Sequence, residues 1–181
     1  MLGCLIVLPI VFGGVFLFYL TKDLPSMNAF DNRKVAQSSK IYDRTGAVLL
    51  YEIHGEEKRT IIPFAEIPER VKQATLAIED VNFYNHAALD YKSIIRAAIA
   101  NLRQGSTVQG GSTITQQLAK NAFLSAERTL TRKLKELILA IELERRYSKD
   151  EILGLYLNQI PYGANSYGIA AAATSYFGKY P

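Results

Sequence analysis

Two adjacent acids, Glu79 and Asp80, stand where a helical pattern ends and a loop begins. The carboxyl end of a helix carries partial negative charge, which disfavours carboxylates there. A pair that opposes local stability requires a compensating interaction or a function. Solvation, or ion pairing with Arg70 or Lys72, is the ordinary explanation, and acid or base chemistry is the functional one. The first group of candidate site residues is Glu79, Asp80, Phe83 and His86.

A second group follows the glycine pair Gly110–Gly111 at the start of a predicted helix. Thr113, with Gln116 three positions later, has the form of a capping box. Thr113, Gln117 and Lys120 have the spacing i, i+4, i+7 and are expected to share one face. Free backbone N–H groups beside a hydroxyl, an amide and a cation would suit a phosphate. A capped surface helix with a solvated polar face is the alternative. The candidate residues are Ser112, Thr113, Gln116, Gln117, Lys120 and Asn121.

The third group is the charged cluster Arg132, Lys133 and Glu136. These residues are predicted to lie on one helix, opposite an apolar stripe that we expect to be buried. An ordinary salt-bridged surface would explain them, because an exposed i, i+4 pair contributes only about 0.2–0.5 kcal/mol. The functional interpretation is a second carboxylate held beside two cations. The expected buried stripe consists of Leu130, Leu134, Leu137, Ile138 and Ile141.

The elements that must position these groups are mostly helices. Pro68 suits a helix start, and Ser148 with Glu151 forms a capping box before a later helix. A small-residue helix is expected over Gly168–Ala173, and short strands around residues 40–62 flank a turn at Asp43–Gly46. The fold class is therefore mainly α, with a small β element. The first of these helices has Val71, Ala74, Thr75 and Ile78 at helical spacing. The next has an apolar stripe of Ile94, Ile95, Ala98, Ile99 and Leu102. Ile114, Leu118 and Ala122 are expected to point to the core.

Residues 1–20 contain no charged side chain. A membrane-spanning helix needs roughly 20 apolar residues. A secretory signal peptide is the alternative, but it would have a basic start and an apolar stretch of only about 7–15 residues. We expect a transmembrane anchor over residues 1–20, a polar linker over 21–39 and a catalytic domain over 40–181.

The composition agrees with a folded domain that meets an anionic partner. Of the 181 residues, 49% are hydrophobic and 21% charged, and the formal net charge is +4. A mildly basic chain suits a lipid surface or a phosphate-bearing substrate. Nucleic acid is not expected, because no basic stripe is interleaved with aromatic residues. Together these features favour acid or base chemistry on a substrate with a phosphate group at a membrane face.

The three groups resemble, in order, the motifs of the peptidoglycan glycosyltransferases of glycosyltransferase family 51. Members form the N-terminal domain of class A penicillin-binding proteins or occur as monofunctional transglycosylases. The resemblance covers about residues 40–181. It rests on the segments Glu79–His86, Gly110–Asn121, Arg132–Glu136, Tyr147–Asn158 and Tyr162–Lys179.

The resemblance implies a lysozyme-like domain with a small membrane-proximal lobe, and lipid II as substrate. A growing glycan on a lipid diphosphate would be the donor. The 4-hydroxyl of lipid II would attack its C1 with inversion, forming a β-1,4 bond and releasing undecaprenyl diphosphate. A single-pass protein of the bacterial inner membrane is implied, with its catalytic domain on the extracytoplasmic side. Other cell-wall synthesis proteins could be partners.

The resemblance also implies roles for individual residues. Glu79 is expected to be the general base, and Glu136 the second catalytic carboxylate, which orients cations or assists at the donor site. Lys120, Arg132 and Lys133 would stabilise the leaving diphosphate, while Thr113 and Gln117 orient oxygens. A divalent cation, Mg²⁺ or Mn²⁺, could bridge the diphosphate, although the sequence offers no dedicated ligand set. The remaining residues expected to bind substrate are Asp80, Phe83, His86, Ser112, Gln116 and Asn121.

Two departures from the family pattern and two rival functions stay open at this point. Ala88 stands where the family usually has glycine, so a left-handed backbone there would be strained. The family domain normally continues beyond Pro181, so we expect a domain that lacks its C-terminal part. The rivals are a lysozyme-like enzyme that cleaves glycans and a membrane-anchored module that only binds lipid II.

Overall fold

The structure, a computed structural model, describes residues 14, 16, 18–22, 24–25, 37–53, 55, 57–106, 110–125, 127 and 129–181. Most of the predicted anchor, residues 1–20, and of the predicted linker, residues 21–39, lies outside these residues. Among the described residues, no helix is both long enough and apolar enough to cross a membrane.

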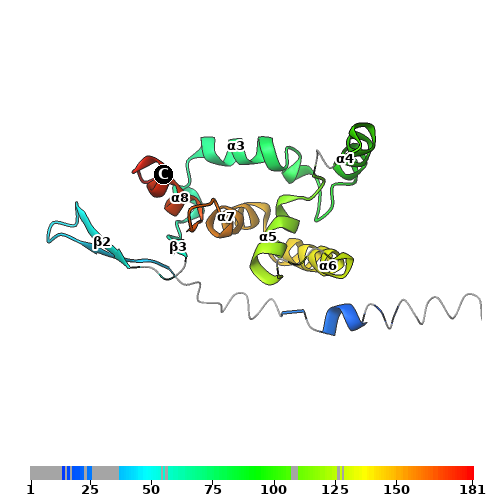
Figure 1. The fold of residues 1–181 in the computed structure, drawn as a ribbon, viewed down its shortest axis with the longest axis horizontal. Coiled ribbons are helices and arrows are strands. Elements are labelled where there is room, and N and C mark those ends of the chain that lie inside the picture. The colour runs from blue at the N-terminus through cyan, green and yellow to red at the C-terminus, as the bar shows by residue number, and fades with distance from the viewer. Residues whose placement is uncertain are drawn as a thin grey trace, which may run out of the picture.

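The first β element is an antiparallel hairpin of β1 (Ser39–Tyr42) and β2 (Leu49–Ile53), as predicted. Asp43 holds the turn, because its carboxylate accepts hydrogen bonds from the Thr45 hydroxyl at 2.6 Å and from the Val48 N–H at 3.1 Å. The hairpin extends away from the helices (Figure 1). It therefore contributes nothing to the packing around the candidate site.

The rest of the described chain is mainly helical, which confirms the mainly α part of the predicted fold class. A two-residue parallel ladder joins β3 (Lys58–Arg59) to β4 (Ser166–Tyr167) and so ties the two ends of this region together. The helices, including two short 3-10 helices, are η1 (Phe64–Glu66), α3 (Glu69–Glu79), η2 (Phe83–Asn85), α4 (Tyr91–Gln104), α5 (Ile114–Phe123), α6 (Leu130–Arg146), α7 (Lys149–Gln159) and α8 (Ile169–Phe177).

Four of these eight helices, α4 to α7, begin at a residue whose side chain caps the helix. Asp90 caps α4 by accepting from the N–H groups of Lys92 and Ser93, and Thr129 caps α6. The capping box predicted at Ser148 and Glu151 is present at the start of α7. These caps satisfy backbone donors that would otherwise lack partners. They explain why the starts of the later helices could be predicted from local sequence.

The core forms where α5 packs against α6 and α7. Ile114 and Leu118 of α5 are fully buried, as predicted, and Ala122 packs partly buried against the same cluster. Figure 1 shows α5 beside α7 and α6, with α3 and α4 farther out. The central helices thus supply most of the buried apolar surface.

The predicted apolar stripe of α6 is wrong. Leu130 is 86% exposed, and Leu134 and Ile141 are also exposed. The buried face of α6 consists instead of Glu136, Leu139, Ala140 and Leu143, which also have helical spacing. The spacing of apolar residues in α6 was compatible with burial of either face. The face with Glu136 can be buried because two cations neutralise that carboxylate.

Two other predicted stripes lie largely on the surface. Helix α3 has no buried residue, and its Ile78 is 82% exposed. In α4 only Ala97 is buried, whereas Ile95 and Leu102 are exposed. Helical periodicity predicted both helices correctly, but these helices have few neighbours within the described chain to cover their apolar residues.

Asn158 of α7 is the polar centre of the packing between α7 and the segment before η1. Its side-chain nitrogen donates to the carbonyls of Ile62 and Gly154, both at 2.9 Å, and its Oδ1 accepts from the Ile62 N–H at 3.0 Å. Gly168 passes so close that a Cβ atom there would lie 2.6 Å from the Asn158 carbonyl oxygen. A glycine is required at this position, which also has φ of +82°.

We predict that Asn158→Ala destabilises the chain by about 2–4 kcal/mol, because it leaves the buried N–H and C=O groups of Ile62 without partners. Urea denaturation followed by circular dichroism measures this change. Gln104→Ala, at the exposed end of α4, is the control and should stay within about 0.5 kcal/mol of the parent. Equal stability of the two variants would contradict the role of Asn158.

Candidate functional site

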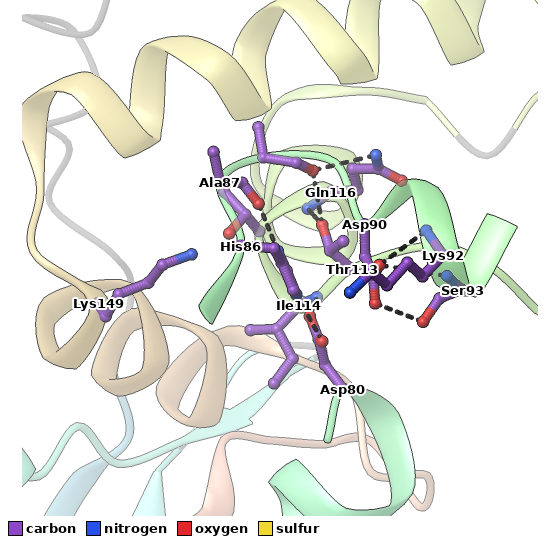
Figure 2. A network of polar contacts seen from close by, with 12 residues as sticks. Asp80, His86, Ala87, Asp90, Lys92, Ser93, Thr113, Ile114, Gln116 and Lys149 are labelled. Atoms are coloured by element: carbon purple, nitrogen blue, oxygen red, sulfur yellow. Dashed lines mark hydrogen bonds and ion pairs between the residues drawn. The ribbon is translucent and has the colours of Figure 1, made fainter. Parts of the chain in front are cut away.

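Asp80 joins three segments of the site. It follows the last residue of α3, and its Oδ1 lies 2.7 Å from His86 Nε2. Its Oδ2 accepts a hydrogen bond from the Ile114 N–H, at the start of α5, at 3.1 Å. Figure 2 shows Asp80 beside His86 and Ile114. Asp80 is buried, so these partners replace the water it has lost.

The start of α5 is not an open anion site. Asp80 already accepts from the Ile114 N–H, and the Thr113 hydroxyl accepts from the Gln116 N–H at 3.3 Å. The prediction of free backbone donors is therefore wrong for these two groups. Thr113 is the N-cap, as predicted, but Gln116 does not reach back to complete a capping box. The electrostatic preference of a helix start for negative charge is met by the protein's own carboxylate.

Thr113 and Gln116 hold the loop after the first motif. The Thr113 hydroxyl donates to the carbonyl of Ala88 at 2.9 Å, and Gln116 Nε2 donates to the same carbonyl at 3.1 Å (Figure 2). Ala88 is buried, and it is not among the described non-glycine residues with positive φ. Alanine therefore fits this position without backbone strain. Thr113 and Gln116 are buried too, so in this structure they support the loop and do not face solvent.

Phe83 and His86 have similar supporting positions. Phe83 is part of the apolar core, and its ring packs edge-to-face against His86 with the centroids 6.4 Å apart. The Lys149 Nζ atom lies 4.5 Å from the Phe83 ring centroid, which is a cation–π contact. These contacts orient the loop on which Asp80 and His86 meet.

Glu79 lies at the mouth of a pocket of about 600 Å³. The Glu79 residue is exposed, and its Oε2 accepts a hydrogen bond from Gln117 Nε2 at 2.8 Å. Gln117 Oε1 in turn accepts from the Tyr156 hydroxyl at 3.1 Å. Glu79 forms no ion pair with Arg70 or Lys72, and Lys72 pairs instead with Glu69 at 3.6 Å. The carboxylate is thus held by an amide and open to the pocket.

Three pocket residues with polar side chains were not predicted from the sequence: Asp90, Ser93 and Arg96. Arg96 donates to the Ser93 hydroxyl at 2.8 Å, and that hydroxyl donates to Asp90. Asp90 as an N-cap before the apolar pattern of α4 was a readable signal, whereas Arg96 looked like any exposed helix residue. The other lining residues include Asp80, Gly110, Gly111, Ser112, Thr113 and Gln117.

Glu136 is buried with the two cations of its motif. Only 2% of the residue is exposed. Its Oε2 accepts from Arg132 at 2.7 Å, and its Oε1 is ion-paired with Lys133. Lys133 also donates to the Ser112 hydroxyl at 2.8 Å and to Gln116 Oε1 at 3.3 Å. The predicted cluster therefore exists, but it ties α6 to the start of α5 and is not a solvated surface.

Lys120 and Asn121 line a second pocket, of about 470 Å³, together with Arg132. Thr113, Gln117 and Lys120, expected to share one helix face, do not line one pocket. Thr113 and Gln117 line the Glu79 pocket, whereas Lys120 does not. Lys120 is exposed and has no ion pair with any other described residue. Arg59 and Gln159 also line this second pocket, and the sequence had not indicated them.

Burial and charge shift the titration of three groups around the site. Burial, followed by the negative charge of Glu79, raises the pKa of Tyr162 to about 12. The same two causes raise the pKa of Tyr156 well above its usual range. The hydrogen bond from the Ser93 hydroxyl lowers the pKa of Asp90. Both tyrosines therefore carry their hydroxyl protons at neutral pH, and Tyr156 donates a hydrogen bond to Gln117 Oε1.

Asp80, His86 and Asp90 lie close enough together to be considered as metal ligands, since their ligand atoms all lie within 4.8 Å of one another. Each of the two carboxylates already has protein partners. Asp80 binds His86 and the Ile114 N–H, and Asp90 caps α4. These protein partners would compete with an ion such as Mg²⁺ for the carboxylate oxygens that it favours as ligands.

Comparisons with known proteins show which family the chain resembles. A family model described as transglycosylase matches residues 46–181. Penicillin-binding protein 1A of Aquifex aeolicus is 50% identical over 166 residues, which cover 92% of this chain and 23% of that protein. Penicillin-binding protein 1A of Pseudomonas aeruginosa is 46% identical, over 93% of this chain and 20% of that protein. Penicillin-binding protein 1A/1B of Bacillus subtilis is 46% identical, over 96% of this chain and 19% of that protein.

The chain thus spans about a fifth of the length of the curated relatives it matches. The family match covers the exposed Glu79, the loop clamped by Asp80 and the buried cluster around Glu136 within one continuous segment. On this match the chain belongs to the transglycosylase family.

Proposed function

We propose that this chain is a peptidoglycan glycosyltransferase that polymerises lipid II into glycan strands by an inverting reaction. The observation that carries this proposal is the position of Glu79, exposed at a pocket and held at one oxygen by Gln117. Lys120, three residues after Gln117 on α5, lines the second pocket, which is cationic. A carboxylate base beside a cation-lined pocket suits displacement of a diphosphate by a hydroxyl group.

Glu79 acts as the general base in this proposal. Gln117 occupies its Oε2, and its Oε1 accepts no hydrogen bond from any residue that the structure describes. The 4-hydroxyl of the acceptor sugar binds in the Glu79 pocket and gives its proton to Oε1 as its oxygen attacks C1 of the donor. Arg96, Ser93 and Ser112 offer polar contacts to that sugar from the pocket wall.

The leaving diphosphate binds in the second pocket. Three residues of α5 correspond to a rise of about 4.5 Å, so Gln117 and Lys120 can serve neighbouring parts of one extended substrate. Lys120, Arg132 and Asn121 present two cations and an amide to the phosphate oxygens. Their charges offset the negative charge that grows on the leaving group in the transition state.

Glu136 acts as a positioning residue and not as a second acid or base. It is buried, and both of its oxygens are engaged by Arg132 and Lys133. A carboxylate without access to substrate cannot transfer a proton to it. Through the ion pair at 2.7 Å, Glu136 instead holds Arg132 at the edge of the diphosphate pocket.

The proposal includes a setting at the membrane. Residues 1–20 anchor the chain in the bacterial inner membrane as a single pass, and the lysozyme-like catalytic domain lies on the extracytoplasmic side, where lipid II is presented. The apolar composition of residues 1–20 supports this setting. Other proteins of cell-wall synthesis are proposed as partners.

The rival glycan-cleaving activity receives less support from the site. Glycosidases place two carboxyl groups across the scissile bond, about 5–9.5 Å apart. In the Glu79 pocket the other described carboxylates are Asp80 and Asp90, and both are engaged by protein donors. A binding module without turnover would leave the open carboxylate of Glu79 without a use.

We predict that Glu79→Gln abolishes polymerisation, with a loss of at least about 100-fold, because the amide cannot accept the proton. Formation of glycan chains from lipid II in detergent micelles measures this activity, and circular dichroism checks the fold. Glu142→Gln, on the exposed surface of α6, is the matched control and should remain active. Normal polymerisation by Glu79→Gln would rule out the proposed base. Soluble fragments released from purified cell wall would support the lytic rival instead.

We further predict that Lys120→Ala lowers kcat/KM for lipid II by about 10–100-fold. The variant lacks the ammonium group that forms a hydrogen bond and ion pair with the diphosphate. Initial rates at lipid II concentrations well below KM give this ratio. Lys135→Ala is the control, since Lys135 lines neither of the two pockets. Equal rates for the two lysine variants would place the diphosphate elsewhere.

A further inference from the structure

Tyr156 stands behind Glu79 at the end of a chain of hydrogen bonds. Its hydroxyl, on α7, donates to Gln117 Oε1 at 3.1 Å, and Gln117, on α5, donates to Glu79 Oε2 at 2.8 Å. The three residues come from three different helices. Tyr156 is only 2% exposed and does not line the Glu79 pocket. The hydrogen bonds that link its hydroxyl to the pocket run through Gln117.

The hydroxyl decides which end of the Gln117 amide faces Glu79. An amide has a donor end and an acceptor end, and rotation by half a turn exchanges them. With Oε1 held by Tyr156, the NH₂ group faces the carboxylate. The exchanged orientation would place the amide oxygen against Glu79, and two acceptors would then face each other. The tyrosine keeps its proton at neutral pH, so it remains a donor.

Without this contact, Gln117 would be held at one end only. A glutamine side chain loses considerable rotamer freedom when it is fixed, so a single hydrogen bond to an exposed carboxylate would hold it poorly. Gln117 is only partly buried. The buried Tyr156 ring therefore provides the rigid end from which the amide reaches the pocket.

We propose that Tyr156 is a positioning residue, which fixes the Gln117 amide so that it holds Glu79 Oε2 and leaves Oε1 for the acceptor proton. This inference rests on the proposed role of Glu79 as general base. It assigns different tasks to the two carboxylate oxygens: one is anchored through Gln117 to α7, and the other accepts the proton. The contact orients a catalytic group and does not bind substrate itself.

The first test replaces the hydroxyl alone. Tyr156→Phe should lower kcat for lipid II polymerisation about tenfold, the effect of about one lost hydrogen bond, while KM changes little. Tyr84→Phe is the matched control, because it also removes one hydroxyl hydrogen bond, to Asp150 at 2.8 Å, without contacting Gln117. An unchanged kcat for Tyr156→Phe, or an equal loss in Tyr84→Phe, would overturn the proposal.

A double-mutant cycle separates positioning from a general effect on packing. In a Gln117→Ala background, Tyr156→Phe should change kcat by less than about twofold, because the residue through which it acts is missing. A second, independent tenfold loss would show that Tyr156 acts by another route, and the proposal would fail.

A measurement without turnover distinguishes this proposal from the proposed function. In ¹⁵N-labelled chain, Tyr156→Phe should shift or broaden the side-chain amide signals of Gln117, which Gln117→Ala identifies by their loss. Tyr84→Phe should leave them in place. If the parent chain makes no glycan but these signals respond, the proposed function fails and the contact stands. If the parent chain is active and the signals do not respond, the positioning role fails.

Discussion

The arrangement of the site depends on one charge placed against two helix ends. Asp80 follows the carboxyl end of α3, where a carboxylate is unfavourable, and its Oδ2 accepts from the Ile114 N–H at the amino end of α5, where a carboxylate is favourable. His86 completes the shell around Asp80 at 2.7 Å. Because α3 stops at this contact, Glu79 reaches the pocket one residue earlier and Gln117 stands one turn along α5. Asp80 is buried, but its hydrogen bonds fix the end of α3 and the start of α5 relative to each other, and so position the site.

A second buried carboxylate, that of Glu136, also helps to position the start of α5. Glu136 is enclosed by Arg132 and Lys133, and Lys133 reaches across to Ser112 and Gln116. Removing one partner from such a cluster would leave an uncompensated charge in a poorly solvated place, which is strongly destabilising. The two carboxylates thus both help to hold the start of α5, while Leu118 and its apolar neighbours supply the core. The polar residues of the family motifs serve the architecture at least as much as they serve the pockets.

Much of the fold was readable because its signals are local. The hairpin turn at Asp43, the capping box at Ser148 and the N-cap Thr113 depend on residues within a few positions of one another, and each is present. The errors concern long-range packing. The apolar residues of α6 have helical spacing on two faces. The face with Glu136 is the buried one, because Arg132 and Lys133 neutralise the charge of this carboxylate. Periodicity likewise predicted α3 and α4 but not the exposure of Ile78 and Leu102. Local sequence patterns do not predict which face of a helix packs against another element.

For the candidate site, the sequence by itself determined the chemistry that is available: an acidic pair at a helix end, a capped helix with polar residues, and a carboxylate beside two cations. Only the tertiary structure decided how these groups are used. In the structure, Asp80 accepts the hydrogen bond from the first N–H group of α5. Gln117 and Lys120 line two different pockets. Tyr156 donates a hydrogen bond to Gln117, which holds Glu79. The physical reason is that a side chain's identity sets what it can donate or accept. Which partner it meets depends on helices distant in sequence, and on which charges can be neutralised once those helices pack.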